Sequence, residues 1–253
     1  MDIRSWGSFP ARVAGPSGRR HSVCALTFAI TAGLLLSGCG DNGVALKKPS
    51  QILKDSAAAL SSAKSFEVEG KVSTGSGTGT FTFKVGGVNL GEGSFSLGKL
   101  KFHLAEVNKT DYVKSATLWE AVDGGALQQL LANRWVSIPA SNPLAKELTG
   151  GVAALTSAKS TAASLTKGDQ KAKREGRTTV DQQGVVKVAL TKTTAIFVAT
   201  SGSPYPVRVT ASKGGYLDLS NFDTNFSITR PKGSVNLLDV IAGLGAGVGG
   251  DGS

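Results

Sequence analysis

The sequence predicts an α+β fold in which a curled antiparallel β-sheet carries helices over one of its faces. Three observations lead to this prediction: a segment of helical period beginning near residue 50, a long series of segments in which apolar and polar side chains alternate, and a central Ala/Leu/Ser-rich insert. Alternation with period two is typical of strands that bury one face. The apolar face of such a sheet needs a cover, and helices are the only segments available to provide it.

The first forty residues have the organisation of an export signal. Arg12, Arg19 and Arg20 form a basic stretch, and residues 23–36 carry no charge. A basic region followed by an apolar run and small residues is typical of a cleaved leader. The run of about fourteen residues is shorter than the roughly 20 that a membrane-spanning helix needs. We therefore expect residues 1–38 to be a signal peptide, with translation starting at Met1 or near Val13.

The end of this leader predicts a lipid anchor. Leu36, Ser37, Gly38 and Cys39 match the lipobox of bacterial lipoprotein precursors, in which the cysteine thiol is acylated before cleavage. Cys24 lies inside the leader, so Cys39 is the only cysteine of the mature chain and no internal disulfide can form. We expect lipidation of Cys39 to hold the protein at the extracytoplasmic face of the cell membrane.

A short tether and a helix follow the anchor. Residues 39–49 are polar and contain Gly43, which fits an acylated tether. Ser50 is placed to act as an N-cap, and the residues after it repeat with helical spacing. The apolar and small face consists of Ile52, Leu53, Ser56, Ala57, Ala59, Leu60 and Ala63.

Four alternating segments after the helix predict a meander of consecutive strands. Gly-rich turns separate them, and their shared apolar side is formed by Phe66, Val68, Gly70, Val72, Phe81, Phe83, Val85, Gly93, Phe95, Leu97, Leu100, Phe102 and Leu104. The opposite side carries serines, threonines and charges. We expect these strands to bury one face against helices.

The rest of the chain alternates between the two kinds of pattern. We expect helices at 125–132 and within 142–165, a charged stretch at 167–177, and a Gly-rich flexible tail at 233–253. Further strands are expected at 112–122, 135–138, 185–190, 194–200, 206–212, 216–219 and 226–229. Residues 50–232 would then form one domain.

Enzyme chemistry finds little support in the sequence. His103 is the single histidine of the mature chain, it falls on the polar side of its strand, and no Gly-x-Ser-x-Gly motif is present. Acidic residues are not grouped at metal-ligand spacing. The run 75–79 lacks the Gly-Lys-Ser/Thr of a phosphate loop and fits a hairpin turn. We therefore expect no enzyme activity, no cofactor and no metal, and no nucleic-acid partner outside the cytoplasm.

Two features leave alternatives open. The chain has a net charge of +10, and Lys167, Lys171, Lys173, Arg174 and Arg177 gather cations that fit either a lipid-headgroup patch or a solvated helix end. Trp119 and Trp135 fit either a cavity wall or ordinary aromatic core packing.

Several segments together resemble the LppX/LprAFG-type lipoproteins of mycobacteria and related actinobacteria. The matching segments are the lipobox and residues 53–55, 57–60, 65–68, 133–139, 175–181, 219–223 and 230–231. The resemblance implies a half-barrel of antiparallel strands with helices covering its concave face. It also implies a hydrophobic cavity and a role in moving lipids or lipoglycans across the cell envelope. A membrane transporter would then be a possible partner. The few aromatic residues allow a small cavity or none.

These observations predict a non-enzymatic, membrane-anchored lipoprotein that binds a lipid or glycolipid for transport across the envelope. The alternative is a structural or scaffolding lipoprotein with a filled core that acts through protein partners. Candidate residues for the cavity lining are Phe66, Val68, Phe81, Phe83, Phe95, Leu97, Phe102 and Leu104.

Overall fold

A computed structural model of the chain describes residues 40–74, 77–123, 125–139, 141–143, 158–165 and 171–247. Cys39, the leader, and most of the predicted helical insert at 142–165 lie outside these residues. The described residues all belong to one compact unit, Gly38–Ser253. None of the described helices is both long enough and apolar enough to cross a membrane.

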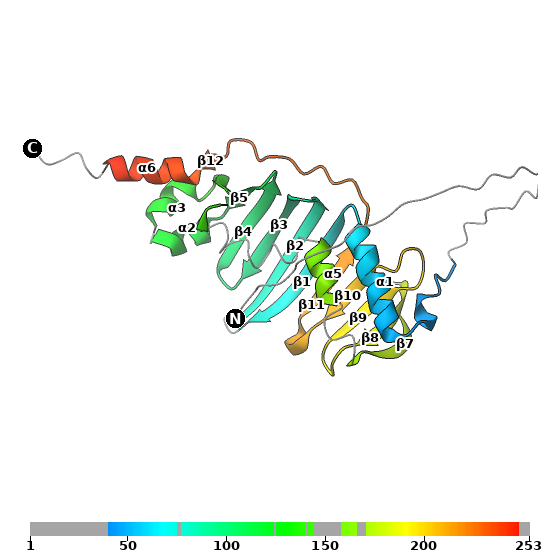
Figure 1. Ribbon diagram of the computed structural model, residues 1–253. Helices are drawn as coiled ribbons and strands as arrows, with labels where there is room; N and C mark the ends of the chain where they lie inside the picture. The colour runs from blue at the N-terminus through cyan, green and yellow to red at the C-terminus, as the bar shows by residue number, and fades with distance from the viewer. Residues whose placement is uncertain are drawn as a thin grey trace, which may run out of the picture. The chain divides into compact units, whose positions relative to one another are not determined.

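The described strands form one open, mostly antiparallel sheet of twelve strands (Figure 1). Its order is β12-β6-β5-β4-β3-β2-β1-β11-β10-β9-β8-β7, and only the β12–β6 pair is parallel. The strands are β1 Phe66–Thr74, β2 Gly77–Gly87, β3 Leu90–Leu97, β4 Leu100–Val107, β5 Thr110–Lys114, β6 Val136–Pro139, β7 Lys173–Val180, β8 Gln183–Ala189, β9 Ala195–Ala199, β10 Pro206–Thr210, β11 Tyr216–Ser220 and β12 Val235–Asn236. The predicted α+β class is confirmed.

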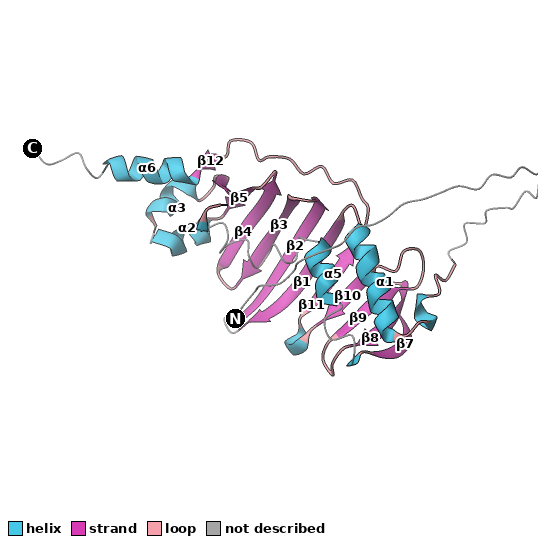
Figure 2. Ribbon diagram, viewed as in Figure 1, coloured by secondary structure: helices cyan, strands magenta, loops and turns pink. Residues whose placement is uncertain are grey.

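Helices lie against this sheet rather than within it (Figure 2). The first, α1, and the later α5 contact each other and lie over the part of the sheet that runs from β1 to β8. Helices α2, α3 and α6 lie at the other end of the sheet, near β5 and β12. The described helical elements are η1 Val44–Leu46, α1 Pro49–Ser62, α2 Ala116–Asp123, α3 Ala126–Leu131, α5 Ala158–Leu165, η3 Ser212–Gly214 and α6 Leu237–Gly247.

The buried face of α1 follows the predicted pattern. Ile52, Leu53 and Leu60 are fully buried and belong to the same apolar core as the inward side chains of the strands. The helix starts earlier than expected, because Pro49 occupies its first turn and Lys48 is the N-cap. Ser50 therefore lies inside the helix, and its predicted capping role is wrong.

The meander from β1 to β4 is confirmed, and its register explains its apolar face. Phe81 lies opposite Phe95, and Phe95 opposite Phe102, so three rings line one side of adjacent strands. The Phe95 and Phe102 ring centroids are 5.2 Å apart. Gly93 leaves room for the ring of Phe83, which a Cβ at this position would strike.

The second half of the chain joins the first through β1. This strand pairs with β2 on one side and with β11 on the other, where Val68 lies opposite Leu219. Strands β8 to β10 extend the sheet beyond β11 and carry Val186, Val188, Ile196 and Val198 into the same core. The two halves therefore share one apolar face.

The strand predicted at 112–122 is wrong in its second half. Strand β5 ends at Lys114, and Ser115 then accepts a hydrogen bond at its Oγ from the backbone N–H of Leu118, 3.0 Å away. This N-cap starts helix α2, whose Leu118 and Trp119 are buried. Trp119 thus belongs to the core from a helix, and Trp135 is half-buried just before β6.

Three other segments differ from the sequence expectations. The predicted strand at 226–229 is absent: residues 224–231 run as irregular chain with only Ile228 buried. The described part of the charged stretch begins at Lys171, and from Lys173 onward it belongs to the edge strand β7. Residues 235–247, within the segment expected to be a Gly-rich tail, form β12 and α6.

Candidate functional site

A cavity of about 380 Å³ lies on the helix-covered face at one end of the sheet. The end of α1, the start of α5, the first residue of β1, the β2–β3 turn and one residue of β4 form its wall. The lining residues are Ser61, Ala63, Lys64, Phe66, Val85, Gly87, Val88, Asn89, Glu106, Ala158 and Lys159. We call it the covered-face cavity.

The floor of the covered-face cavity is apolar. Phe66 and Val85 lie opposite each other on β1 and β2 and are 0% and 3% exposed. Ala63 and Ala158 add small side chains from the helices. Val88, in the tight turn after β2, is 90% exposed and marks the mouth of the cavity. An apolar floor that ends in an exposed valine fits the apolar part of a ligand.

Charged groups surround this apolar floor. Lys64 and Lys159 are exposed and lie at the rim. Glu106 lines the cavity from β4, and burial raises the pKa of its carboxyl. Its cross-strand neighbour Asp111 is only 5% exposed, and its carboxylate makes no hydrogen bond or ion pair with the residues that the structure describes. Burial, together with the Glu106 charge, raises the pKa of Asp111 to about 6.

A stack of aromatic rings supports the cavity from one side. Phe222 lies parallel to Tyr205, with ring centroids 4.0 Å apart, and stacks on Phe66 at 6.4 Å. Asp223 accepts hydrogen bonds from the backbone N–H of Lys64 at 2.8 Å and from the Tyr205 hydroxyl at 2.7 Å. Both hydrogen bonds lower the pKa of Asp223, and the one from the backbone N–H of Lys64 has the larger effect. The position of Phe66 is thereby tied to the β9–β10 loop.

The eight residues predicted to line a cavity share one face, but the structure separates them. Phe66 lines the covered-face cavity, and Phe81, Phe95 and Phe102 touch a second hollow of about 490 Å³ beside α2 and α3. Leu104 borders a shallow hollow of about 350 Å³ with Trp135. The remaining three are Val68 and Phe83, which pack in the core, and Leu97, which is half-buried at the end of β3.

Sequence reasoning missed most of the covered-face cavity. The polar residues of its rim belong to no recognisable sequence motif. They are Lys64 after α1, Asn89 in a turn, Glu106 at the end of β4 and Lys159 in α5. The alternation in β4 placed Glu106 on the same side as Leu104, and a carboxylate on an apolar face was the available signal.

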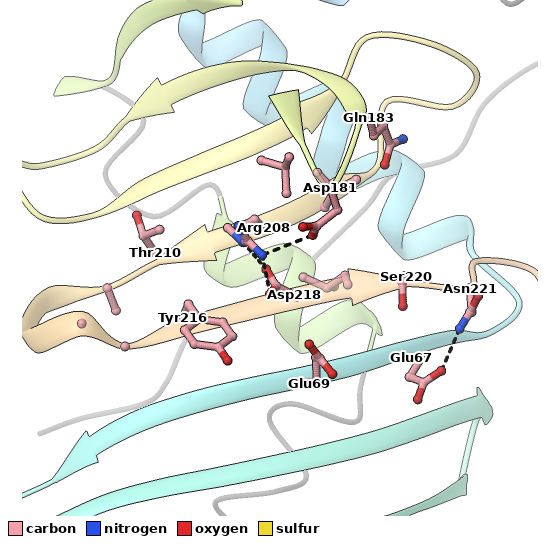
Figure 3. A pocket seen from close by; sticks show the side chains of 16 residues that line it. Glu67, Glu69, Asp181, Gln183, Arg208, Thr210, Tyr216, Asp218, Ser220 and Asn221 are labelled. Atoms are coloured by element: carbon pink, nitrogen blue, oxygen red, sulfur yellow. Dashed lines mark hydrogen bonds and ion pairs between the residues drawn. The ribbon is translucent and has the colours of Figure 1, made fainter. Parts of the chain in front are cut away.

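Another hollow, of about 890 Å³, lies on the opposite face of the sheet and contains several charged side chains (Figure 3). Arg208 of β10 binds Asp218 of β11 through two nitrogens, one of them at 2.7 Å, and reaches Asp181 at 3.3 Å. Asn221 donates to Glu67 at 2.8 Å. These charged groups lie among the apolar lining residues Val180, Val207 and Leu219. An acyl chain placed here would take charged groups out of water, so the hollow fits such a chain poorly.

The structure also places the other residues singled out by the sequence. His103 is exposed on the polar face, as its position in the alternation predicted. Among the residues that the structure describes, no three His, Cys, Asp or Glu side chains are grouped so that they could hold a metal ion. Thr74 pairs with Gly77, so the glycine-rich run lies at a hairpin, although residues 75 and 76 fall outside the description.

The segment expected to be a tether is bound to the domain. Asn42 donates its Nδ2 to the carbonyl oxygens of Ala199 and Gly202, each at 3.0 Å. Asp41 forms an ion pair with Arg177, and Arg174 donates to the carbonyl oxygen of Ala45 at 2.6 Å. Val44 and Ala45 are buried. Two of the cations of the predicted basic patch therefore hold the N-terminal segment.

Comparisons with known proteins find similarity in structure alone. No family model and no curated protein matches the sequence. The chain is similar to LprF from Mycobacterium bovis, with 18% identity, a TM-score of 0.49 and coverage of 72% of this chain and 96% of that one. It is also similar to the Mycobacterium tuberculosis lipoprotein LppX, with 12% identity, a TM-score of 0.42 and coverage of 72% and 98%. An uncharacterized conserved protein from Thermus thermophilus matches at 13% identity, a TM-score of 0.36 and coverage of 75% and 99%.

Proposed function

We propose that this protein is a membrane-anchored lipoprotein that binds an acyl chain of a lipid or glycolipid and carries it across the cell envelope. The observation that carries the proposal is the covered-face cavity, whose apolar floor of Phe66 and Val85 lies beneath a rim with Lys64 and Lys159. An apolar interior with a few polar groups at the mouth is the usual organisation of a small-molecule site.

The chemistry of the site suits an amphiphile with an anionic head. Each methylene buried in the cavity contributes about 0.8 kcal/mol, so part of one acyl chain would supply most of the affinity. The two rim lysines would bind phosphate or carboxylate oxygens, and Asn89 offers a hydrogen-bonding amide.

The anchor belongs to the same proposal. Acylation of Cys39 would place two chains in the bilayer and hold the domain stably at the extracytoplasmic surface. Replacing Cys39 by Ser should abolish metabolic labelling with a radioactive fatty acid. Label that persists in the Cys39→Ser protein would remove the anchor from the proposal.

Ligand binding is tested on the mature chain carrying Cys39→Ser, purified from its bacterial host and examined by native mass spectrometry. A retained mass equal to that of a lipid supports the carrier function. A ligand-free domain that ignores added phospholipid instead supports the rival, a scaffolding lipoprotein with a filled core.

A pair of variants on α5 locates the ligand. Ala158→Phe would fill the covered-face cavity, whereas Ala163→Phe lies on the exposed side of the same helix and serves as the matched control. We expect the first variant to lose the lipid while retaining the fold by circular dichroism, and the second to keep it. Equal lipid retention by the two variants would place the ligand elsewhere.

A further inference from the structure

The chain between the anchor and the folded domain is very short. Asp41 pairs with Ser201 as an isolated β-bridge and binds Arg177 through its carboxylate, and the backbone N–H of Asn42 donates to the carbonyl oxygen of Thr200 at 2.8 Å. Asp41 is two residues from Cys39, so an extended chain can separate their Cα atoms by no more than about 7 Å. The surface around Asp41 would therefore lie close to the lipid headgroups.

The loop that holds this segment is joined to the covered-face cavity. Residues 200–205 follow β9 and supply carbonyl oxygens that bind Asn42. The same loop ends at Tyr205, whose ring stacks on Phe222, which in turn stacks on Phe66 of the cavity floor. The docked N-terminal segment and the cavity are thus connected by a continuous set of contacts.

The strand register places both features at the same end of the sheet. Ser201 lies just after the end of β9, β11 ends at Ser220 beside Glu67, and Phe66 begins β1 opposite Val85 near the end of β2. The β2–β3 turn with Val88 continues this margin of the sheet, because Gly87 at the end of β2 pairs with Leu90 at the start of β3. The opposite end of β3 carries the turn with Lys99.

The exposed groups at the cavity mouth fit the surface of a bilayer. Val88 is 90% exposed, and it shares the site with the cations of Lys64 and Lys159. Lys109, in the β4–β5 turn, lies at the same margin, because Asn108 donates its backbone N–H to the carbonyl oxygen of Asn89 at 3.1 Å. An apolar side chain among lysines matches an anionic headgroup layer with acyl chains beneath it.

We propose that the mouth of the covered-face cavity faces the membrane to which the protein is anchored, with Val88 at the anionic phospholipid surface. The docked segment 41–47 fixes this orientation by leaving almost no free chain after Cys39. A lipid then passes between bilayer and cavity without crossing water. This inference rests on the proposed function, both on acylation of Cys39 and on lipid binding in the cavity.

A pair of labelled variants tests the orientation. Val88→Cys and Lys99→Cys place a thiol at the two ends of β3, which are separated by about 25 Å in an extended strand of this length. Acylation blocks Cys39, so an environment-sensitive fluorophore reacts only with the introduced cysteine. The mature acylated proteins are reconstituted into vesicles of phosphatidylcholine and phosphatidylglycerol that contain a spin-labelled lipid.

We expect quenching at position 88 to exceed quenching at position 99 severalfold. Equal quenching, or stronger quenching at position 99, overturns the orientation. As a second measurement, insertion of about ten Gly and Ser residues between Gly40 and Asp41 leaves the folded domain unchanged but adds a flexible linker. This insertion should abolish the difference between the two positions, and a difference that survives it shows that the docked segment does not set the orientation.

Failure of this inference is distinguishable from failure of the proposed function. Lipid retention is measured separately, by native mass spectrometry of the Cys39→Ser protein. Retained lipid with equal quenching at the two positions overturns the orientation alone. Strong quenching at position 88 without retained lipid supports docking of this end on the bilayer and overturns the carrier function.

Discussion

The ring of Tyr205 lies flat on the ring of Phe222, with centroids 4.0 Å apart and an angle of 6° between the planes. Its hydroxyl donates to Asp223 at 2.7 Å. Burial is the main cause that raises the pKa of Tyr205, and this hydrogen bond raises it further. One side chain therefore links the β9–β10 loop to the segment that follows β11. Because the contact joins the docked N-terminal segment to the cavity floor, it is the first place to test by mutation.

Tyr205→Phe and Tyr205→Ala separate the two parts of this contact. The Phe variant keeps the stack and loses one hydrogen bond, so we expect a loss of about 1 kcal/mol in the free energy of unfolding. The Ala variant also loses the aromatic packing and should cost about 2–3 kcal/mol. Urea denaturation measures both values, and equal losses would show that the stack contributes nothing.

Asp111 gives the protein a defined dependence on pH. Its folded pKa of about 6 lies above its ordinary value of 3.8, so its ionisation disfavours the folded state. The stability associated with the neutral carboxyl is complete below about pH 4 and is lost as the pH rises to about 6. Asp111→Asn should therefore stabilise the protein on the order of 1 kcal/mol at pH 7 and have little effect at pH 4. Urea midpoints across this range measure the difference, and a difference that does not change with pH would contradict the assignment.

Gly93 and Gly91 on β3 form a matched pair for the close approach of Phe83. A Cβ at position 93 would overlap the carbonyl oxygen of Thr82 and the ring of Phe83, whereas at position 91 its nearest neighbour is the carbonyl oxygen of Lys84 at 3.4 Å. We expect Gly93→Ala to cost about 3 kcal/mol because the ring has to move. Gly91→Ala should change stability by less than about 1 kcal/mol. Thermal unfolding followed by circular dichroism distinguishes them, and similar melting temperatures would refute the packing argument.

Ser56 carries a buried hydroxyl without a hydrogen-bond partner among the residues that the structure describes. Ser56→Ala should raise the free energy of unfolding by about 1 kcal/mol, because the desolvated hydroxyl is removed and alanine favours the helix. Ser62→Ala in the same helix is the control, since the Ser62 hydroxyl is exposed and donates to the carbonyl oxygens of Ala58 and Ala59. A loss of stability on Ser56→Ala would indicate that the hydroxyl has a partner in solution.

The sequence was most informative where each pattern was local. Alternation of apolar and polar residues predicted β1 to β4, because adjacent hairpin strands bury one face. Each of these strands can be recognised from its own residues, without knowledge of distant parts of the chain. The same rule failed at 112–122, where Tyr112 and Val113 belong to a strand but Leu118, Trp119 and Val122 have helical spacing. Ser115 between them was the overlooked N-cap.

The site could be predicted only in part, because its residues meet through long-range packing. Phe66 was named from its strand pattern, but nothing in the sequence showed that Lys159 and Asn89 would lie at the same mouth. Likewise, the predicted strand at 226–229 alternates correctly, yet the chain there has to travel from β11 in the middle of the sheet to β12 at its edge. That path leaves no strand for it to pair with along the way.

The pairing of β1 with β11 has a consequence for how the chain folds. Asn221 and Glu67, which meet across this pair, are 154 positions apart, whereas β1 to β5 follow one another through short turns. The first five strands can therefore assemble early and expose one side of β1 until β11 arrives, since closing so long a loop is slow. Glu67, Glu69 and Lys71 place charges along β1 during that interval. Charged side chains discourage strands of other molecules from adding to an open edge, so they would protect a newly made chain from aggregation before its sheet is complete.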